Sequence, residues 1–143
     1  MRLAALALAA SLPAAPPPAD SADLVVRIDN LRSAKGLVRL CLTRDPAHFP
    51  DCKGDPAART ASLSAAEAGA VRFTHVAPGT YAIAVIHDEN GNGKLDTLAM
   101  MPREGFGFSK NPAIRFGPPK FGQAQFVVGG QNGEQRIRVR YLL

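Results

Sequence analysis

Short stretches in which apolar and polar residues alternate recur along the chain. The clearest covers residues 135–142, where Ile137, Val139 and Tyr141 alternate with three arginines. A period of two places one face of a β-strand in a core and the other face in water. Shorter stretches bounded by turn residues predict further strands at 24–28, 36–42, 71–76, 81–87 and 123–128. The pattern therefore predicts an all-β fold.

The predicted strands are short and helical periodicity is nearly absent, which favours an antiparallel β-sandwich, with a closed barrel as the alternative. We expect 24–28 and 36–42 to form a hairpin through a turn at 30–35. Residues 43–67 are rich in Pro, Asp, Ala and Ser, and are expected to form a long loop with one helical turn near 64–68. The turn-rich region 88–121 is expected to carry the functional surface, because loops on a rigid scaffold commonly do.

The first residues have the organisation of a secretory signal peptide. Arg2 is followed by an apolar run of Leu and Ala and then by small residues and prolines. The run is too short to span a bilayer, which takes about 20 apolar residues. We therefore expect residues 1–22 to be a signal peptide and Pro-rich leader with an undetermined cleavage point. Residues 23–143 would form one domain, periplasmic or secreted and not membrane-spanning.

The two cysteines, Cys41 and Cys52, lie close together in the sequence. An oxidising compartment favours a disulfide between them, and closing so short a loop contributes about 2 to 3 kcal/mol in the chain-entropy model. With His48 between them the pair could instead hold a metal, but two thiols and one imidazole fall short of a closed zinc site. We predict the disulfide.

The formal charge of +5 is unevenly distributed, since seven basic residues and only two acidic ones follow residue 102. A basic face on an exported protein could meet anionic lipid, polysaccharide or another envelope protein. Nucleic acid is not expected as a partner, because export separates the two and no binding motif is present. The simpler interpretation is a solvated strand face. The basic residues of this region are Arg103, Lys110, Arg115, Lys120, Arg136, Arg138 and Arg140.

Residues 88–96, Asp-Glu-Asn-Gly-Asn-Gly-Lys-Leu-Asp, match the start of an EF-hand type of calcium loop. Alternate residues of such a loop point oxygens at one cation, and the glycine at position six permits the sharp bend. The predicted ligands are the side chains of Asp88, Asn90, Asn92 and Asp96 and the carbonyl of Lys94.

The match is partial, because position twelve is Ala99, where the full motif has a bidentate Glu. Calcium takes about 6 to 8 oxygens, so water or Glu104 would complete the site, and weak affinity of about 10⁻⁴ to 10⁻³ M is expected. The alternative is a hairpin turn in which the two Asn-Gly pairs only supply positive φ angles.

His87 immediately precedes this loop and is a candidate general base beside a metal-bound water. The simpler interpretation is a strand-end histidine hydrogen-bonded to a neighbouring loop. Phe106 and Phe108 lie in a Gly-Phe-Gly-Phe segment and are candidates for binding a sugar or peptide. We prefer the interpretation in which these rings fold back as a plug over the open end of the sandwich.

Three segments together resemble one known family: His87 through Asp96, Met101 through Ser109, and 116–119, Phe-Gly-Pro-Pro. They are similar to the exported bacterial family called domain of unknown function 2141. This resemblance runs from about residue 24 to the end of the chain, and implies an exported β protein without implying an activity. The cysteine pair is not part of the family pattern.

The segment Phe73 through Val85, with its Val-Ala-Pro-Gly-Thr-Tyr core, is similar to transthyretin-like and carboxypeptidase-regulatory modules. The resemblance implies an Ig-like or transthyretin-like β-sandwich of about seven strands with long loops. Such modules are binding or structural accessories, and the resemblance does not identify a ligand for this chain.

Three functions follow as hypotheses. The first is a non-enzymatic envelope module, binding or structural, whose 88–96 loop takes calcium. The second is a metal-assisted hydrolase that uses His87 as base. The third is a polysaccharide-binding module that uses Phe106, Phe108 and the basic strand.

Overall fold

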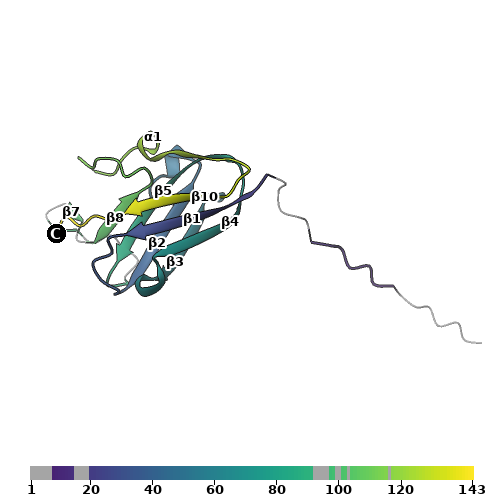
Figure 1. Ribbon diagram of the computed structural model, residues 1–143, viewed down its shortest axis with the longest axis horizontal. Coiled ribbons are helices and arrows are strands. Elements are labelled where there is room, and N and C mark those ends of the chain that lie inside the picture. The colour runs from purple at the N-terminus through teal and green to yellow at the C-terminus, as the bar shows by residue number, and fades with distance from the viewer. Residues whose placement is uncertain (1–7, 15–19, 92–96, 99–100, 103, 116) are drawn as a thin grey trace, which may run out of the picture.

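The computed structural model describes residues 8–14, 20–91, 97–98, 101–102, 104–115 and 117–143. Residues 8–14 are exposed and belong to a tail that runs away from the folded domain (Figure 1). The strands are β1 (Ala22–Asp29), β2 (Leu37–Thr43), β3 (Arg59–Ser64), β4 (Ala70–Val76), β5 (Gly79–Asp88), β6 (Thr97–Leu98), β7 (Met101–Pro102), β8 (Gly105–Phe108), β9 (Phe126–Val128) and β10 (Gly133–Arg138). Three short helices, η1 (Pro46–His48), η2 (Ala65–Glu67) and α1 (Phe121–Ala124), complete the described elements.

Two sheets pack face to face, which confirms the predicted all-β sandwich (Figure 1). The smaller sheet has the order β10-β1-β4, and the larger has the order β3-β2-β5-β8, with β9 also pairing with β5. All pairs are antiparallel except β1 with β10, which are parallel. Among the described residues, the helices are all too short and too polar to cross a membrane.

The expected hairpin between 24–28 and 36–42 is wrong. β1 pairs with β10 and β4, whereas β2 pairs with β3 and β5 in the other sheet. Both segments carry one apolar face, and a two-stranded hairpin would leave both faces in water. In the sandwich the chain crosses between the sheets after β1, so that the two apolar faces oppose each other across one core.

The core lies between the sheets and follows the predicted alternation. Alternate residues of β1, β4 and β10 face the core from the smaller sheet, and alternate residues of β2 and β5 face it from the larger sheet. The most deeply buried of these side chains are Val26, Val38, Leu42, Ile83, Val85, Ile137 and Val139. The intervening arginines of β10 face outward, as the period of two predicts.

Strand β8 reads Gly-Phe-Gly-Phe, and the two residue types serve opposite faces. A Cβ on Gly105 would collide with Tyr141, and one on Gly107 would collide with Ile137, so glycine lets β10 and the residues after it pack close against β8. The sheets meet there, since Phe106 and Arg140 exchange two backbone hydrogen bonds of 3.0 and 2.8 Å. One side of the sandwich is therefore closed in the manner of a barrel.

A second, smaller apolar cluster covers the outer face of the larger sheet. The cysteines form the predicted disulfide, with Cα atoms 5.8 Å apart, and it ties the loop after β2 to that face. The region 43–67, predicted as loop, also contains β3, whose inward Ala61 and half-buried Leu63 make only a weak apolar pattern. The helical turn expected near 64–68 is present as η2.

Candidate functional site

The His87-Asp88 pair lies where β5 ends, and its two side chains point to opposite faces of the sheet. His87 lies on the face that carries Ile83 and Val85, inside the sandwich, and is fully buried. Asp88 lies on the outer face with Ala84, and only 1% of it is exposed. The neighbouring sequence positions therefore lie in separate environments.

Both ring nitrogens of His87 have partners inside the protein. Nε2 lies 2.8 Å from the Lys35 carbonyl oxygen, and because a carbonyl only accepts, Nε2 carries the proton. Nδ1 then accepts from the hydroxyl of Tyr141 at 2.7 Å. That hydroxyl in turn accepts from the backbone N–H of Arg32 at 3.1 Å. Burial raises the pKa of Tyr141, which keeps its hydroxyl protonated as the donor that this chain of hydrogen bonds needs.

Glu89 turns away from the 88–96 loop toward the connection between β1 and β2. Its carboxylate accepts from Arg32 Nε at 2.8 Å and from Ser33 Oγ at 2.9 Å. Burial alone raises the pKa of Glu89, but the hydrogen bonds from Arg32 and Ser33 and the nearby positive charge outweigh it and lower the pKa below its ordinary value. The Arg32 guanidinium also lies 4.4 Å above the Tyr141 ring.

The connection between β1 and β2 reaches this position because of Gly36. Its φ of +70° is in the left-handed region, and an added Cβ would collide with the carbonyls of Asp88 and Glu89. The glycine therefore lets the backbone at 30–36 lie directly against the start of the 88–96 loop. There the chain turns, with Gly91 N–H donating to the Asp88 carbonyl at 3.2 Å.

On the outer face, Asp88 contacts a side chain of β2 and lies opposite a residue that just precedes β8. Arg39 of β2 donates from Nε to Asp88 Oδ2 at 3.2 Å. On the other side, β5 and β8 pair through His87 and Gly105, and one further step of this antiparallel register places Glu104 opposite Asp88. Only 4% of Glu104 is exposed. The register thus places two buried acidic residues, sixteen positions apart in sequence, opposite each other on neighbouring segments.

Of the predicted calcium ligands, Asp88, Asn90 and the additional candidate Glu104 lie in the described part of the chain. Asn90 is exposed at the turn after β5, whereas Asp88 and Glu104 are buried. The other three predicted ligands, Asn92, Lys94 and Asp96, lie outside the described residues. Sequence reasoning missed Arg39, whose only signal is its alternation with apolar residues along β2.

Phe106 and Phe108 are buried on the outer face of the larger sheet, where 7% of each is exposed. Phe49, from the disulfide-closed loop, packs edge-on against Phe108 with ring centroids 5.9 Å apart. Phe49 also meets Phe121 of α1 in the same way at 6.0 Å. The rings thus form the small second core instead of a plug at the open end of the sandwich, and they present little aromatic surface.

The basic strand face is partly neutralised by its neighbours. Arg136 pairs with Asp29 at 3.1 Å, and Arg27 of β1 pairs with Glu134 at 3.0 Å. Arg138 is exposed and Arg140 is half-buried beside Phe106, and both line a shallow surface hollow. These pairs agree with a solvated face whose charge is partly balanced by an adjacent strand.

Comparison with known proteins gives one match. A family model described as "Uncharacterized protein conserved in bacteria (DUF2141)" matches residues 26–136, from the middle of β1 to the middle of β10. No curated protein and no solved structure matches the chain.

Proposed function

The chain belongs to the DUF2141 family of bacterial proteins, and we propose that it is a non-enzymatic binding or structural module of the cell envelope, with a loop at 88–96 that is ordered by calcium. The proposal rests on that membership and on His87, whose two ring nitrogens are both hydrogen-bonded within the protein. The module would serve an envelope protein or a polysaccharide as its partner.

His87 carries the non-enzymatic part of the proposal. A general base needs an accessible lone pair within hydrogen-bond reach of its substrate. In His87, Nε2 donates to a backbone carbonyl and Nδ1 accepts from Tyr141, and the ring is fully buried. This arrangement is typical of a core histidine that fixes the end of a strand.

An envelope location is supported by two independent features. The cysteines form a disulfide, which is typical of proteins in oxidising compartments. The first residues also have the organisation of a secretory signal peptide. Both features agree with a protein that works outside the cytoplasm.

Asp88 and Glu104 carry the calcium part of the proposal. Buried carboxylates are costly unless a positive charge or hydrogen bonds compensate them, and close like charges add to the cost. Asp88 pairs with the Arg39 guanidinium, and a divalent cation between the two segments would add a positive charge beside both acids. Calcium suits such a site because it prefers oxygen ligands in flexible geometry. Glu104 would then replace the missing carboxylate at position twelve of the loop.

Thermal unfolding in calcium and in chelator tests the proposal. With a dissociation constant of about 1 mM, 10 mM calcium would stabilise the fold by about 1.4 kcal/mol and raise Tm by about 5 °C. Magnesium at the same concentration should have a smaller effect, because it demands a stricter octahedral geometry. Asp88→Asn and Glu104→Gln should remove the calcium effect, and Asp51→Asn, in a different loop, should keep it.

An unchanged Tm across these conditions would remove calcium from the proposal. The non-enzymatic part has its own test, a panel of phosphate and ester substrates with calcium, magnesium, manganese and zinc. Turnover that is lost in His87→Ala, with the fold retained, would establish the hydrolase alternative instead.

A further inference from the structure

A group of potential metal ligands lies in the loop that the disulfide closes and in the residues just after it. Asp45 and Asp55 each offer a carboxylate oxygen and His48 offers a ring nitrogen, and these three atoms all lie within 4.8 Å of one another. His48 Nδ1 and Asp45 Oδ2 are 2.7 Å apart. All three side chains are partly exposed, so an ion and its water ligands would have access from solvent.

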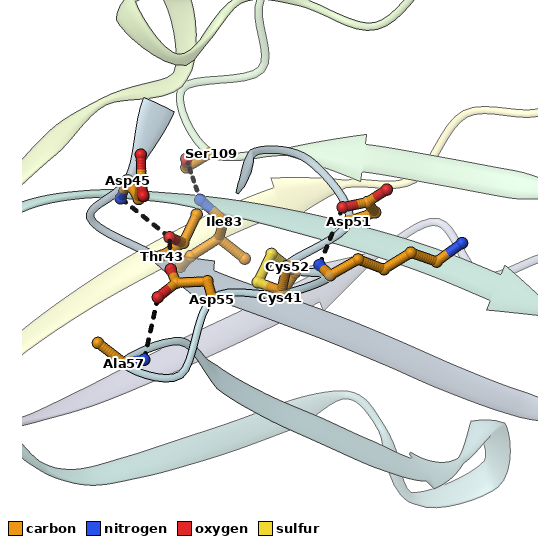
Figure 2. Close-up of a disulfide and its surroundings, with 10 residues drawn as sticks. Cys41, Thr43, Asp45, Asp51, Cys52, Asp55, Ala57, Ile83 and Ser109 are labelled. Atoms are coloured by element: carbon orange, nitrogen blue, oxygen red, sulfur yellow. Dashed lines mark hydrogen bonds between the residues drawn. A yellow bond between two sulfur atoms is a disulfide. The ribbon is translucent and has the colours of Figure 1, made fainter. Parts of the chain in front are cut away.

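Both carboxylates are held in place by hydrogen bonds from backbone and side chain. Asp45 Oδ1 accepts from Ala47 N–H and Asp55 Oδ1 accepts from Ala57 N–H, each at 2.9 Å. Thr43 lies between the two acids, and its hydroxyl donates to Asp55 Oδ2 at 2.6 Å and accepts from Asp45 N–H at 2.9 Å (Figure 2). Such partners fix the direction of ligating oxygens before any ion arrives.

The loop that carries these residues is short and strongly constrained. Cys52 is joined to Cys41 on β2, and its N–H donates to the His48 carbonyl at 2.8 Å. Phe49 anchors the middle of the loop on Phe108. An ion would therefore meet a largely preformed site and would not have to order a free segment.

In the described part of the chain, His48 is the one basic side chain paired with the charges at this site. Among the described residues, no lysine or arginine forms an ion pair with Asp45 or Asp55, and His48 is the only ion-pair partner of Asp45. The backbone hydrogen bond from Ala47 lowers the pKa of Asp45, and the hydrogen bond from Thr43 lowers that of Asp55, so both remain ionised at neutral pH. Two ionised carboxylates beside an imidazole attract a cation.

We propose that Asp45, His48 and Asp55 bind a divalent transition-metal ion such as zinc, at a site separate from the 88–96 loop. The imidazole decides the class of metal, because nitrogen and carboxylate ligands together suit zinc and its neighbours, whereas calcium takes oxygen only. Three protein ligands leave at least one position to water. The ion would join Asp45 and His48, inside the disulfide-closed loop, to Asp55, which follows Cys52.

Binding would replace the hydrogen bond between His48 and Asp45 by two bonds to the ion. The ligating nitrogen must be unprotonated, so binding competes with protons and weakens on acidification. The loop would gain stability through the ion, and Tm would rise with the concentration of zinc.

Calorimetric titration of the chelator-treated, disulfide-intact protein with zinc tests the proposal, and the absorption spectrum of bound cobalt reports the ligand set. We expect one ion per chain. His48→Ala, Asp45→Asn and Asp55→Asn should each weaken binding more than about tenfold, since loss of even an outer partner of a metal ligand costs about 10- to 100-fold. Asparagine at 45 can still cap η1, so Asp45→Asn keeps the local fold.

Two variants serve as matched controls. Asp51→Asn changes an exposed carboxylate in the same loop, and His75→Ala changes an exposed histidine on β4, and both should bind zinc within about twofold of the unchanged protein. Two results would overturn the proposal. One is zinc binding that is equally strong in His48→Ala, and the other is the absence of saturable binding up to about 1 mM zinc, a concentration at which even a weak site should fill. Because the calcium test uses Asp88 and Glu104, the two proposals fail or succeed separately.

Discussion

The hydroxyl of Tyr141 lies 2.7 Å from Nδ1 of His87, and this hydrogen bond ties the end of β5 to the last residues of the chain. The same hydroxyl accepts from Arg32, so the connection between β1 and β2 is held at the same point. The histidine that sequence made a candidate base thus lies at the centre of a network that fixes the start of the 88–96 loop.

Tyr141→Phe should destabilise the protein by about 1 to 3 kcal/mol, because it leaves the buried Nδ1 of His87 without a donor. Chemical denaturation measures the change. Tyr81→Phe is the matched control, since the Tyr81 hydroxyl makes a single hydrogen bond to the Ala77 carbonyl at 2.7 Å. An equal loss in the two variants would mean that the Tyr141 network adds nothing beyond one ordinary hydrogen bond.

Stability should fall on acidification in part through Glu89. Its folded-state pKa lies below the ordinary value of 4.5, so its contribution is complete above that value and is lost as the pH falls through the lowered pKa. Between about pH 5 and pH 3, Glu89→Gln should therefore lose less stability than the unchanged protein. Urea unfolding at a series of pH values measures this, with the exposed Glu67→Gln as control. Parallel curves for Glu89→Gln and the unchanged protein would contradict the prediction.

Gly107→Ala should destabilise the fold by about 1 to 3 kcal/mol, because the added methyl group overpacks the contact with Ile137. Ile137→Ala should relieve part of this cost in the double variant, which a double-mutant cycle measures. Gly122→Ala is the control, because an added Cβ there meets nothing within 4 Å. Strict additivity of the two changes would argue against the close packing of β8 on the last strand.

Removing the disulfide by Cys41→Ala with Cys52→Ala should cost about 3 kcal/mol in the chain-entropy model for a loop of this length. Phe49 depends on the same loop for its position against Phe108, so the aromatic cluster should loosen as well. Chemical denaturation measures the stability, and near-ultraviolet circular dichroism measures the packing of the rings. A loss of stability with an unchanged aromatic signal would show that Phe49 is held without the disulfide.

The alternation of residues predicted most of the fold because burial of one strand face is a local property. The strands around Val26, Leu40 and Ile137 were found in this way, and the cysteine pair was predicted from its spacing. Strand pairing is not local, which is why the predicted hairpin was wrong. Nothing in residues 24–42 records that β1 takes a parallel partner more than a hundred positions away.

Only part of the candidate site could be predicted, because local spacing is visible in the sequence and the pairing of distant strands is not. The oxygen-rich spacing after His87 is visible in the sequence, but the placement of Glu104 opposite Asp88 follows from the β5–β8 register. The hydrogen bond between Tyr141 and His87 could not be predicted either, because the sequence pattern shows Tyr141 only as one more apolar position in an alternating strand. The Gly-Phe-Gly-Phe segment was predicted as a loop because glycine is rare in strands. Here the glycines lie on the inner face of β8, where a side chain would collide with Ile137 and Tyr141.

The parallel pairing of β1 with β10 has a consequence for how the protein is made. As the chain emerges from the ribosome, its first strand has no partner on that edge until almost all other residues have been synthesised, and contacts between such distant segments form slowly. The incomplete sheet would meanwhile expose backbone groups that can pair with other chains. Productive folding should therefore begin in the larger sheet, where the consecutive strands β2 and β3 pair with each other, and the smaller sheet should close last.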